Sequence, residues 1–366
     1  MNVLVFTNSI GGLYNFRKEV ILAIVAAGYE VYISVPDCDS RAVFFEANGC
    51  HIIQTNLNRR GTNPLSDIKL MLTYRKYIKQ FRPIVILTYT IKPNVYGGIA
   101  ARLCKIPQLA NVTGLGDSIE NDGWLKKLTV SLYRIGLMKA RRIFFQNEEN
   151  RNICIKYGIA SKESLLLPGS GVNLIHHTFK TYPQQEDVIR FLFIGRLLKD
   201  KGIEEYYAAA RCVKQKYPNT EFEILGKCDD EIQKERLDYF VKEGVVVYLG
   251  VTTDVRPYIE KVHCTIMPSY HEGMSNVNLE SAANGRPVIT TNVPGCRETV
   301  DDGITGFLVK VKDTQSLIEG IEKFLNLSYE QKKQMGLEGR KKVESEFDRQ
   351  IVINSYLNEI KQIDNV

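Results

Sequence analysis

Short apolar runs alternate with helical segments along the whole chain, and this alternation restarts once. The first set of runs covers residues 3–7, 31–35, 84–90 and 142–147. The second set covers residues 190–197, 222–226, 245–250, 264–269, 286–291 and 306–310. Continuous apolar strands separated by helices predict parallel sheets that are covered on both faces. We therefore expect an α/β protein with two Rossmann-like, doubly wound domains and a cleft between them.

The length of the chain agrees with two domains, because 366 residues suffice for two units of about 100–200 residues each. We predict an N-terminal domain over residues 1–170 and a second domain over residues 171–345. The polar, proline-bearing segment 176–188 fits neither a helical nor a strand period, and we interpret it as the linker.

No stretch of about 18 apolar residues occurs, and no basic region precedes the first apolar run. We therefore expect no membrane span, no signal peptide and a cytoplasmic location. The eight cysteines are scattered without metal-ligand spacing, which argues against a zinc site or a disulfide framework. A G-x-G-x-x-G fingerprint is missing too, so a nicotinamide cofactor is not expected.

Charge is distributed unevenly. Residues 1–170 hold 22 Lys and Arg against 12 Asp and Glu, a net charge of +10, whereas the remaining residues hold 26 against 30, a net charge of −4. Segment 124–142 has six basic residues, including Lys126 and Lys127, no acid, and apolar residues at helical spacing. It either lies on an anionic membrane surface or packs on its own domain with a solvated basic face. No nucleic-acid-binding motif accompanies the charge, so a nucleic acid partner is not expected.

Ligands of open α/β sheets bind beyond the carboxyl ends of the strands, where loops and helix N-termini converge. After the first strand, we expect Gly11 and Gly12 to lie in a loop that precedes a helical pattern over residues 15–27, and glycines there allow a close approach of the backbone to a ligand. In the second domain, Gly195 and Arg196 end a strand and Lys201 precedes a helix. Two cations can thus meet one anion at a helix N-terminus.

Residues 271–280 read HEGMSNVNLE and place two carboxylates eight residues apart, directly after a predicted strand. A carboxylate can accept two hydrogen bonds from a vicinal diol, so we interpret Glu272 as binding sugar hydroxyls and Glu280 as binding ribose hydroxyls. Eight helical residues span about 12 Å, roughly the separation of a sugar and a ribose across a diphosphate. A helix starting at Ser275 or Asn276 would offer a diphosphate the free amides of Gly273, Met274, Ser275 and Asn276.

These motifs together resemble the family 4 retaining glycosyltransferases of the GT-B fold. The resemblance rests on E-x7-E within residues 268–280, on GRLLKDKG at 195–202, on VPGCRETVDDGITGFLV at 293–309 and on the order of the two predicted sheets. More narrowly, LTYTIKPNVYGGIAARL, NVTGLG, RRIFFQNEENRN and LLPGSGVN look like the branch that adds sugars to polyprenyl-diphosphate-linked intermediates of bacterial surface polysaccharides or glycoproteins.

The resemblance implies transfer of a hexose or hexosamine from a UDP-sugar to an undecaprenyl-diphosphate-linked saccharide, with retention and without a metal or other cofactor. Glu272, Arg196 and Lys201 would form the catalytic set, the two cations neutralising the leaving diphosphate. The implied contacts of the nucleotide sugar further include Gly11, Gly12, Gly195, Val251, Gly273, Met274, Ser275, Asn276, Val277 and Glu280.

On the acceptor or membrane side, the resemblance points to the basic first domain, at Arg59, Arg60, Lys92, Thr113, Lys126 and Lys127. Many relatives carry a histidine at the position of Thr113 and an aromatic residue at that of Asp117, so no acceptor base is assigned. The resemblance also implies that residues 346–366 form a helix that crosses back to the first domain. We expect the enzyme to associate peripherally with the inner face of the cell membrane.

Two other classes of function stay open. A GT-B nucleotide-sugar epimerase would use one substrate and would need acids and bases around C2 of the sugar, for which the sequence offers no clear set. A non-catalytic nucleotide-sugar-binding protein would bind the donor without turnover.

Overall fold

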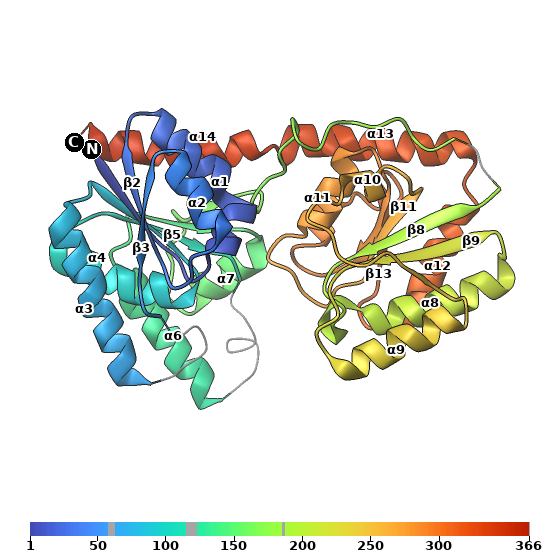
Figure 1. Ribbon diagram of the computed structural model, residues 1–366, viewed down its shortest axis with the longest axis horizontal. Helices are drawn as coiled ribbons and strands as arrows, with labels where there is room; N and C mark the ends of the chain where they lie inside the picture. Colours follow the sequence, from blue (N-terminus) through green and yellow to red (C-terminus); the bar gives the residue numbers. More distant parts are fainter. Residues whose placement is uncertain (58–62, 115–122, 185–186, 366) are drawn as a thin grey trace. The chain divides into compact units, whose positions relative to one another are not determined.

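The computed structural model describes residues 1–57, 63–114, 123–184 and 187–365. The chain forms two compact units (Figure 1). Unit 1 comprises Met1–Ser170 together with Gln350–Val366, and unit 2 is the continuous segment Gly171–Arg349. Among the described residues, no helix combines the length and the hydrophobicity needed to cross a bilayer.

Unit 1 is built on a parallel sheet of seven strands in the order β3-β2-β1-β4-β5-β6-β7, counted over its described residues. The strands are β1 (Asn2–Phe6), β2 (Glu30–Val35), β3 (Cys50–Gln54), β4 (Val85–Tyr89), β5 (Gln108–Val112), β6 (Arg142–Phe145) and β7 (Leu165–Leu166). The helical segments are α1 (Ile10–Ala26), α2 (Ser40–Ala47), α3 (Pro64–Phe81), η1 (Pro93–Gly97), α4 (Gly98–Cys104), α6 (Trp124–Leu137), α7 (Glu148–Lys156) and α14 (Arg349–Asp364).

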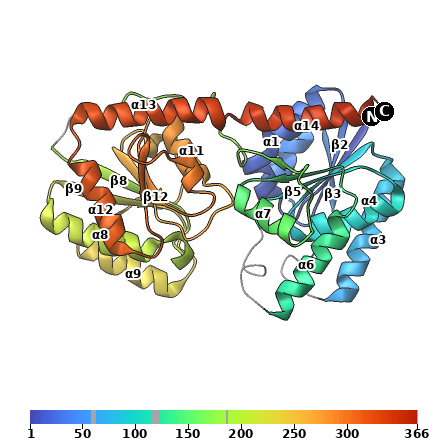
Figure 2. The same ribbon diagram turned by 180° about the vertical axis from the view of Figure 1, so that it is seen from behind.

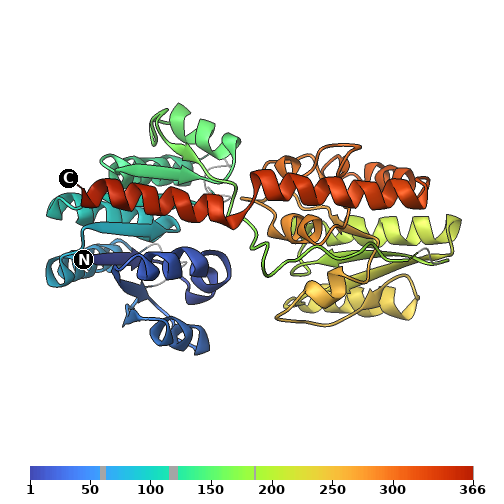
Figure 3. The ribbon, with the colours of Figure 1, turned by 90° about the horizontal axis from the view of Figure 1, so that it is seen from above.

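Helices cover both faces of this sheet, which is why most of its strands are largely apolar. On one face α1, α2 and α14 pack on the sheet, and Figure 3 shows the red α14 running beside the blue α1. The last helix contributes Val352, Tyr356 and Ile360 to this core, all fully buried. On the other face η1, α3, α4, α6 and α7 pack on the strands.

Unit 2 is built on a parallel sheet in the order β10-β9-β8-β11-β12-β13. Its strands are β8 (Ile189–Ile194), β9 (Thr220–Leu225), β10 (Val247–Tyr248), β11 (Cys264–Met267), β12 (Val288–Thr291) and β13 (Gly306–Val309). Its helical segments are η2 (Lys199–Lys201), α8 (Ile203–Lys216), α9 (Glu231–Lys242), α10 (Arg256–Ile259), α11 (Asn276–Ala283), η3 (Arg297–Thr299), α12 (Thr314–Leu325) and α13 (Tyr329–Glu346). Figure 2 shows this unit from the other side.

Strand order reverses between β1 and β4 in unit 1 and between β8 and β11 in unit 2, because the neighbours at these points are not consecutive in sequence. In doubly wound sheets ligands bind at the carboxyl ends of the strands at such a switch point. We therefore expect the loops that follow these four strands to contact the ligands.

The predicted α/β class with two Rossmann-like, doubly wound units is confirmed, and all ten predicted strands are present, with ends that differ by a few residues. The interpretation of segment 176–188 as a linker is wrong. Its Tyr182 is buried and donates a hydrogen bond to the His263 carbonyl, and Arg286 donates to the carbonyls of Lys180 and Thr181, all within unit 2. The chain instead leaves unit 1 between Ser170 and Gly171.

The prediction that Gly11 and Gly12 lie in a loop is also wrong, because α1 begins at Ile10. Ser9 caps this helix, its hydroxyl accepting a hydrogen bond from the Gly12 amide at 3.1 Å. A polar cap side chain two residues before the glycine pair therefore sets the start of the helix, earlier than the apolar pattern from residue 15 onward indicates.

Candidate functional site

The loop after β8 reaches the loop after β11 through a glycine. Gly202 follows η2 with a φ of +73°, and a Cβ at this position would lie 2.0 Å from the Pro268 carbonyl oxygen. Only glycine fits both the left-handed conformation and this close approach. The turn that carries Lys201 is thereby pressed against the end of β11.

This contact brings two of the predicted catalytic side chains together. The Lys201 Nζ lies 2.6 Å from the Glu272 Oε1, and the Ser269 hydroxyl donates to the same oxygen at 3.0 Å. Both side chains of the ion pair are only 17% exposed. Low exposure strengthens the attraction, so the pair fixes the Glu272 carboxylate at the switch point of unit 2.

Arg196, the third predicted catalytic residue, does not join this pair. It follows Gly195 at the end of β8 and is exposed, and its side chain makes no hydrogen bond or ion pair with any described residue. The structure therefore holds one cation against Glu272 and leaves the other in solvent.

A second turn, at Gly295, packs against the loop that carries Glu272. The sequence analysis assigned no role to this turn. Gly295 has a φ of +81°, and a Cβ there would lie 2.3 Å from the Glu272 carbonyl oxygen. The Gly295 carbonyl accepts a hydrogen bond from the Ser275 amide at 2.7 Å. The proline-glycine dipeptide at 294–295 was the available signal, because such a pair marks a tight turn.

The amides at the start of α11 differ in their availability. Ser275 is the cap of the helix, and its hydroxyl accepts a hydrogen bond from the Asn278 amide. Because the Ser275 amide donates to Gly295, it is not free to bind a diphosphate, contrary to expectation. The side chain of Met274 is buried against Leu279, so only its backbone can face a ligand.

The helical spacing assumed between the two glutamates is wrong, because α11 begins only at Asn276. Glu272 lies in the loop and Glu280 within the helix, so a rise of eight helical residues does not separate them. Asn276 and Val277 form the first turn, and both are half-buried.

Glu280 makes no hydrogen bond or ion pair through its carboxyl group with any described residue. Burial raises the pKa of this carboxyl to about 7, and the positive charge of Arg349 partly opposes the rise. An acceptor group without a partner in a low-dielectric position is suited to receive hydroxyl donors from a ligand.

Val251, expected near the nucleotide base, lies in the loop after β10 and is 65% exposed. In unit 1, Gly11 is buried beneath Arg41, whose Nη1 lies 2.3 Å from where a Cβ would stand. Gly12 is half-buried in the same turn. An Arg41 side chain, itself paired with Asp39, thus covers the start of α1.

The predicted acceptor-side residues are spread over several elements. Lys92, after β4, pairs with Asp67 at 2.6 Å, and the Tyr96 hydroxyl donates to the other Asp67 oxygen at 2.8 Å. Thr113 follows β5 and is half-buried. The remaining predicted residues are Lys126 and Lys127 on α6, and Arg59 and Arg60, which lie outside the described residues together with Asp117.

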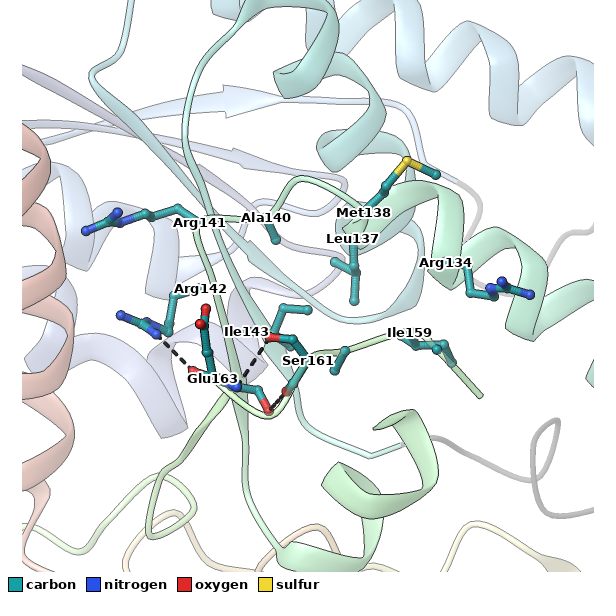
Figure 4. A pocket seen from close by; sticks show the side chains of 13 residues that line it. Arg134, Leu137, Met138, Ala140, Arg141, Arg142, Ile143, Ile159, Ser161 and Glu163 are labelled. Carbon is teal, nitrogen blue, oxygen red and sulfur yellow. Dashed lines mark hydrogen bonds between the residues drawn. The ribbon is translucent and has the colours of Figure 1, made fainter. Parts of the chain in front are cut away.

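Unit 1 also contains a pocket of about 450 Å³ at the amino end of β6, at the opposite edge from the strand ends discussed above. Figure 4 shows its side chains, with Arg142 donating to the Glu163 carbonyl. Arg142 and Arg141 both pair with Glu359 of α14, at 2.6 and 3.6 Å. Because two of its three arginines serve to hold α14, this pocket does not qualify as the substrate site.

Within the described ranges, no group of three His, Cys, Asp or Glu side chains is arranged to hold a metal ion.

Solved structures share this architecture. A glycosyltransferase from Rickettsia africae superposes with a TM-score of 0.83 over 99% of this chain and 98% of its own, at 17% identity. Anabaena HepE in complex with UDP and glucose superposes with a TM-score of 0.80, covering 99% of both chains at 16% identity. Two parallel Rossmann-like sheets of this kind define a protein of the GT-B class.

Sequence families narrow the class. Residues 176–342 match the family of group 1 glycosyl transferases, and residues 4–147 match the glycosyl transferase 4-like family. Both matched segments are glycosyltransferase domains, and the chain is a glycosyltransferase enzyme.

Curated relatives match over most of their length. An N,N'-diacetylbacillosaminyl-diphospho-undecaprenol alpha-1,3-N-acetylgalactosaminyltransferase of Campylobacter jejuni is 28% identical over 86% of both chains. The capsular polysaccharide biosynthesis glycosyltransferase CapM of Staphylococcus aureus is 27% identical over 78% of this chain and 79% of its own. A UDP-Gal:alpha-D-GlcNAc-diphosphoundecaprenol alpha-1,3-galactosyltransferase of Escherichia coli is 25% identical over 73% and 74%.

Proposed function

We propose that this glycosyltransferase moves a hexose or N-acetylhexosamine from a UDP-sugar to an undecaprenyl-diphosphate-linked saccharide, with retention of configuration, in surface polysaccharide or glycoprotein synthesis. The observation that carries the proposal is the match, along most of the chain, to two relatives named for transfer to diphospho-undecaprenol-linked sugars.

The donor half of the proposal is supported by the Lys201–Glu272 pair at the switch point of unit 2. An incoming diphosphate competes with Glu272 for Lys201, which frees the Glu272 carboxylate to accept hydroxyl groups of the sugar. Lys201 and the exposed Arg196 then neutralise the leaving diphosphate, and Glu280 accepts the ribose hydroxyls. In this scheme no metal is required, and the leaving phosphate itself takes the acceptor proton.

A lipid-linked acceptor requires the enzyme to reach a membrane, and two helices of unit 1 suit this contact. Exposed apolar side chains project from the first two turns of α6, namely Trp124 and Leu128. Exposed Leu65, Ile68 and Leu72 lie in the first half of α3. Both helices follow parallel strands, so their N-terminal ends lie at the carboxyl edge of the sheet (Figure 1).

Lys126 and Lys127 lie between the exposed apolar residues of α6, and basic residues near a surface attract anionic headgroups. This combination of exposed large apolar side chains and adjacent cations is typical of an interfacial helix. We therefore include peripheral binding to an anionic membrane in the proposed function.

The test is release of nucleoside diphosphate by the purified protein across UDP- and GDP-sugars, with and without an undecaprenyl-diphosphate-linked monosaccharide. Acceptor-stimulated release of UDP, together with an α-linked product from an α-linked donor, is the expected result. Turnover of the nucleotide sugar alone into its epimer would reject transfer in favour of an epimerase. Tight UDP binding without turnover on any acceptor would point to a binding protein instead.

A further inference from the structure

A buried arginine without a counter-ion lies at the switch point of unit 1. Arg17, in the second turn of α1, is 3% exposed, and its Nε has no hydrogen-bond partner among the described residues. Its Nη1 donates to the Phe16 carbonyl at 2.8 Å, and no described carboxylate forms an ion pair with it. Burial of an uncompensated charge is costly, so a cation kept in such a place requires an explanation.

The position of this cation agrees with a ligand site. The Arg17 guanidinium lies 5.8 Å from the ring centroid of Tyr89, the last residue of β4. β4 is the strand that pairs with β1 where the strand order reverses. Arg17 therefore reaches the edge of the sheet at which open α/β proteins bind their ligands.

Other polar groups at the same strand ends also lack protein partners. Thr90, directly after β4, has a φ of +74°, and its buried hydroxyl has no hydrogen-bond partner among the described residues. Asn111 is paired with Tyr89 across β4 and β5 and is fully buried. Its side-chain Nδ2 donates to the Tyr356 hydroxyl, but its side-chain Oδ1 has no partner among the described residues.

The strained backbone at Thr90 strengthens the case, since a β-branched residue with positive φ is a rare conformation. Such strain tends to persist at binding sites, where it places a side chain for a ligand. An ordered water could satisfy one of these polar groups, but a neutral water leaves the charge of Arg17 uncompensated.

Lys92 cannot supply this charge to a ligand without first breaking its buried pair with Asp67. Among the predicted acceptor-side residues that are described, it is the one nearest in sequence to Tyr89. Arg17, which the sequence analysis did not single out, lies at this strand end and forms no ion pair with any described carboxylate.

We propose that the Arg17 guanidinium binds a phosphoryl anion of a substrate at the carboxyl end of β4, with the Thr90 hydroxyl as a second donor. This inference rests on the proposed function, in which both substrates carry a diphosphate. The two sources of the anion are the lipid-linked acceptor and the nucleotide sugar, and we assign it to the acceptor because Lys201 already serves the donor in unit 2.

The experiment compares Arg17→Met, which keeps the length and removes the charge, with Arg17→Lys, which keeps the charge. Lys18→Met removes the same charge from the next residue of α1 and is the matched control. For Arg17→Met we expect the KM of the diphosphate-linked acceptor to rise roughly 10- to 100-fold, as for loss of a charge-assisted hydrogen bond. Arg17→Lys should recover part of this loss. In both Arg17 variants the kcat and the UDP affinity should stay unchanged, and the melting temperature should stay unchanged or rise.

A rise in the dissociation constant of UDP instead of the acceptor KM would keep the phosphoryl site but assign it to the donor. A lower melting temperature with a uniformly lower kcat, and no change in either KM, would overturn the proposal in favour of a purely structural arginine.

A second measurement does not depend on turnover. Inorganic pyrophosphate should slow hydrogen exchange of a peptide that spans the end of β4 in the wild type and in Lys18→Met, but not in Arg17→Met. A peptide covering residues 269–280 of unit 2 serves as the internal reference. Equal exchange at β4 in all three proteins would overturn the proposal, whereas inactivity of the wild type on every acceptor, with protection at β4 intact, would reject only the proposed function.

Discussion

At the scale of single residues, Glu280 connects the charge state of the site with its function. The pKa of the Glu280 carboxyl is about 7 in the folded protein and has the ordinary value of 4.5 in the unfolded chain. Between pH 4.5 and about 7, the folded protein therefore keeps a proton that the unfolded chain has released. Between these values the native state binds more protons than the unfolded state, so the contribution of Glu280 to stability falls as pH rises. The charged carboxylate is thus available for a ligand only near and above neutral pH.

We predict that the affinity for UDP increases as pH rises through about 7 and levels off above it. The reason is that the carboxylate accepts two ribose hydroxyls, whereas the protonated acid accepts fewer hydrogen bonds. Calorimetric titration of UDP over this pH range is the measurement. Glu280→Gln should bind about 1.5–3 kcal/mol more weakly at high pH and lose this pH dependence. A variant that retains the full wild-type pH profile would remove the ribose role from Glu280.

Single residues of the site could be predicted where the local sequence identifies them, and not where their role depends on contacts with distant parts of the chain. The position after a strand and the residue types identified Lys201 and Glu272 as candidates, and the structure pairs them. Gly295 and Arg17 were missed, because their importance comes from contacts across the fold. A Cβ clash with the Glu272 carbonyl and a missing counter-ion leave no local pattern in the sequence.

At the scale of elements, α14 is held to unit 1 by a buried charge. Glu359 is 5% exposed and lies between Arg142 at 2.6 Å and Arg141 at 3.6 Å. Because Arg142 and Arg141 are partly exposed, loss of Glu359 removes charge-assisted contacts without leaving a fully buried charge, which typically costs about 1.5–3 kcal/mol. This anchor joins the apolar contacts of the same helix with the core.

We predict that Glu359→Gln lowers the free energy of unfolding of unit 1 by about 1.5–3 kcal/mol, as measured by urea denaturation. The control is Glu330→Gln, since the ion pair of Glu330 with Lys333 has its carboxylate 75% exposed, and its loss should cost about 1 kcal/mol or less. Equal losses in the two variants would contradict an anchoring role for Glu359.

The exposed apolar ends of α3 and α6 make a separate prediction. The double variant Leu65→Ser with Trp124→Ser should bind anionic lipid vesicles at least about tenfold more weakly in a sedimentation assay, because burial of one large apolar side chain contributes about 1.5–3 kcal/mol. Leu103→Ser, at the far end of α4 and 55% exposed in the wild type, is the control. Unchanged vesicle binding of the double variant would exclude these helices as the membrane contact.

Elements were predicted well where the pattern was long and apolar, and less well elsewhere. β3, β5 and the two-residue β7 were missed. The polar residues of β3 and β5 interrupt the apolar run: β3 contains His51 and Gln54, and β5 begins at Gln108. Gln108 and Asn111 are nevertheless buried, since hydrogen bonds to Thr88, Asn94 and Tyr356 satisfy most of their polar atoms. A buried polar network of this kind depends on partners that the local sequence does not specify.

At the scale of the whole molecule, the two units differ in how the chain builds them. Unit 2 is one continuous segment with its own core, whereas unit 1 needs residues from both ends of the chain. We predict that the fragment 171–349 unfolds cooperatively and binds UDP within about tenfold of the full chain, because the proposed donor contacts of Lys201, Glu272 and Glu280 lie inside it. Calorimetry and thermal melting provide the measurements.

The complementary truncation should behave differently. A chain that ends at residue 348 lacks Val352, Tyr356 and Ile360, each contributing about 1.5–3 kcal/mol of burial, against a typical total stability of 5–15 kcal/mol. We expect it to be insoluble or inactive. A soluble, fully active product of this truncation would contradict the part assigned to α14, and a disordered 171–349 fragment would contradict the independence of unit 2.

The late arrival of α14 has a consequence for biosynthesis. A ribosome completes unit 2 before it makes the helix that closes the core of unit 1, although most of unit 1 is synthesised first. Until α14 has been translated, the face of the first sheet that receives Val352 and Tyr356 stays open, and exposed apolar surface of this kind favours aggregation and recruits chaperones. Unit 1 can therefore complete its core only after α14 is synthesised. The delay is at least the time needed to translate about 180 intervening residues.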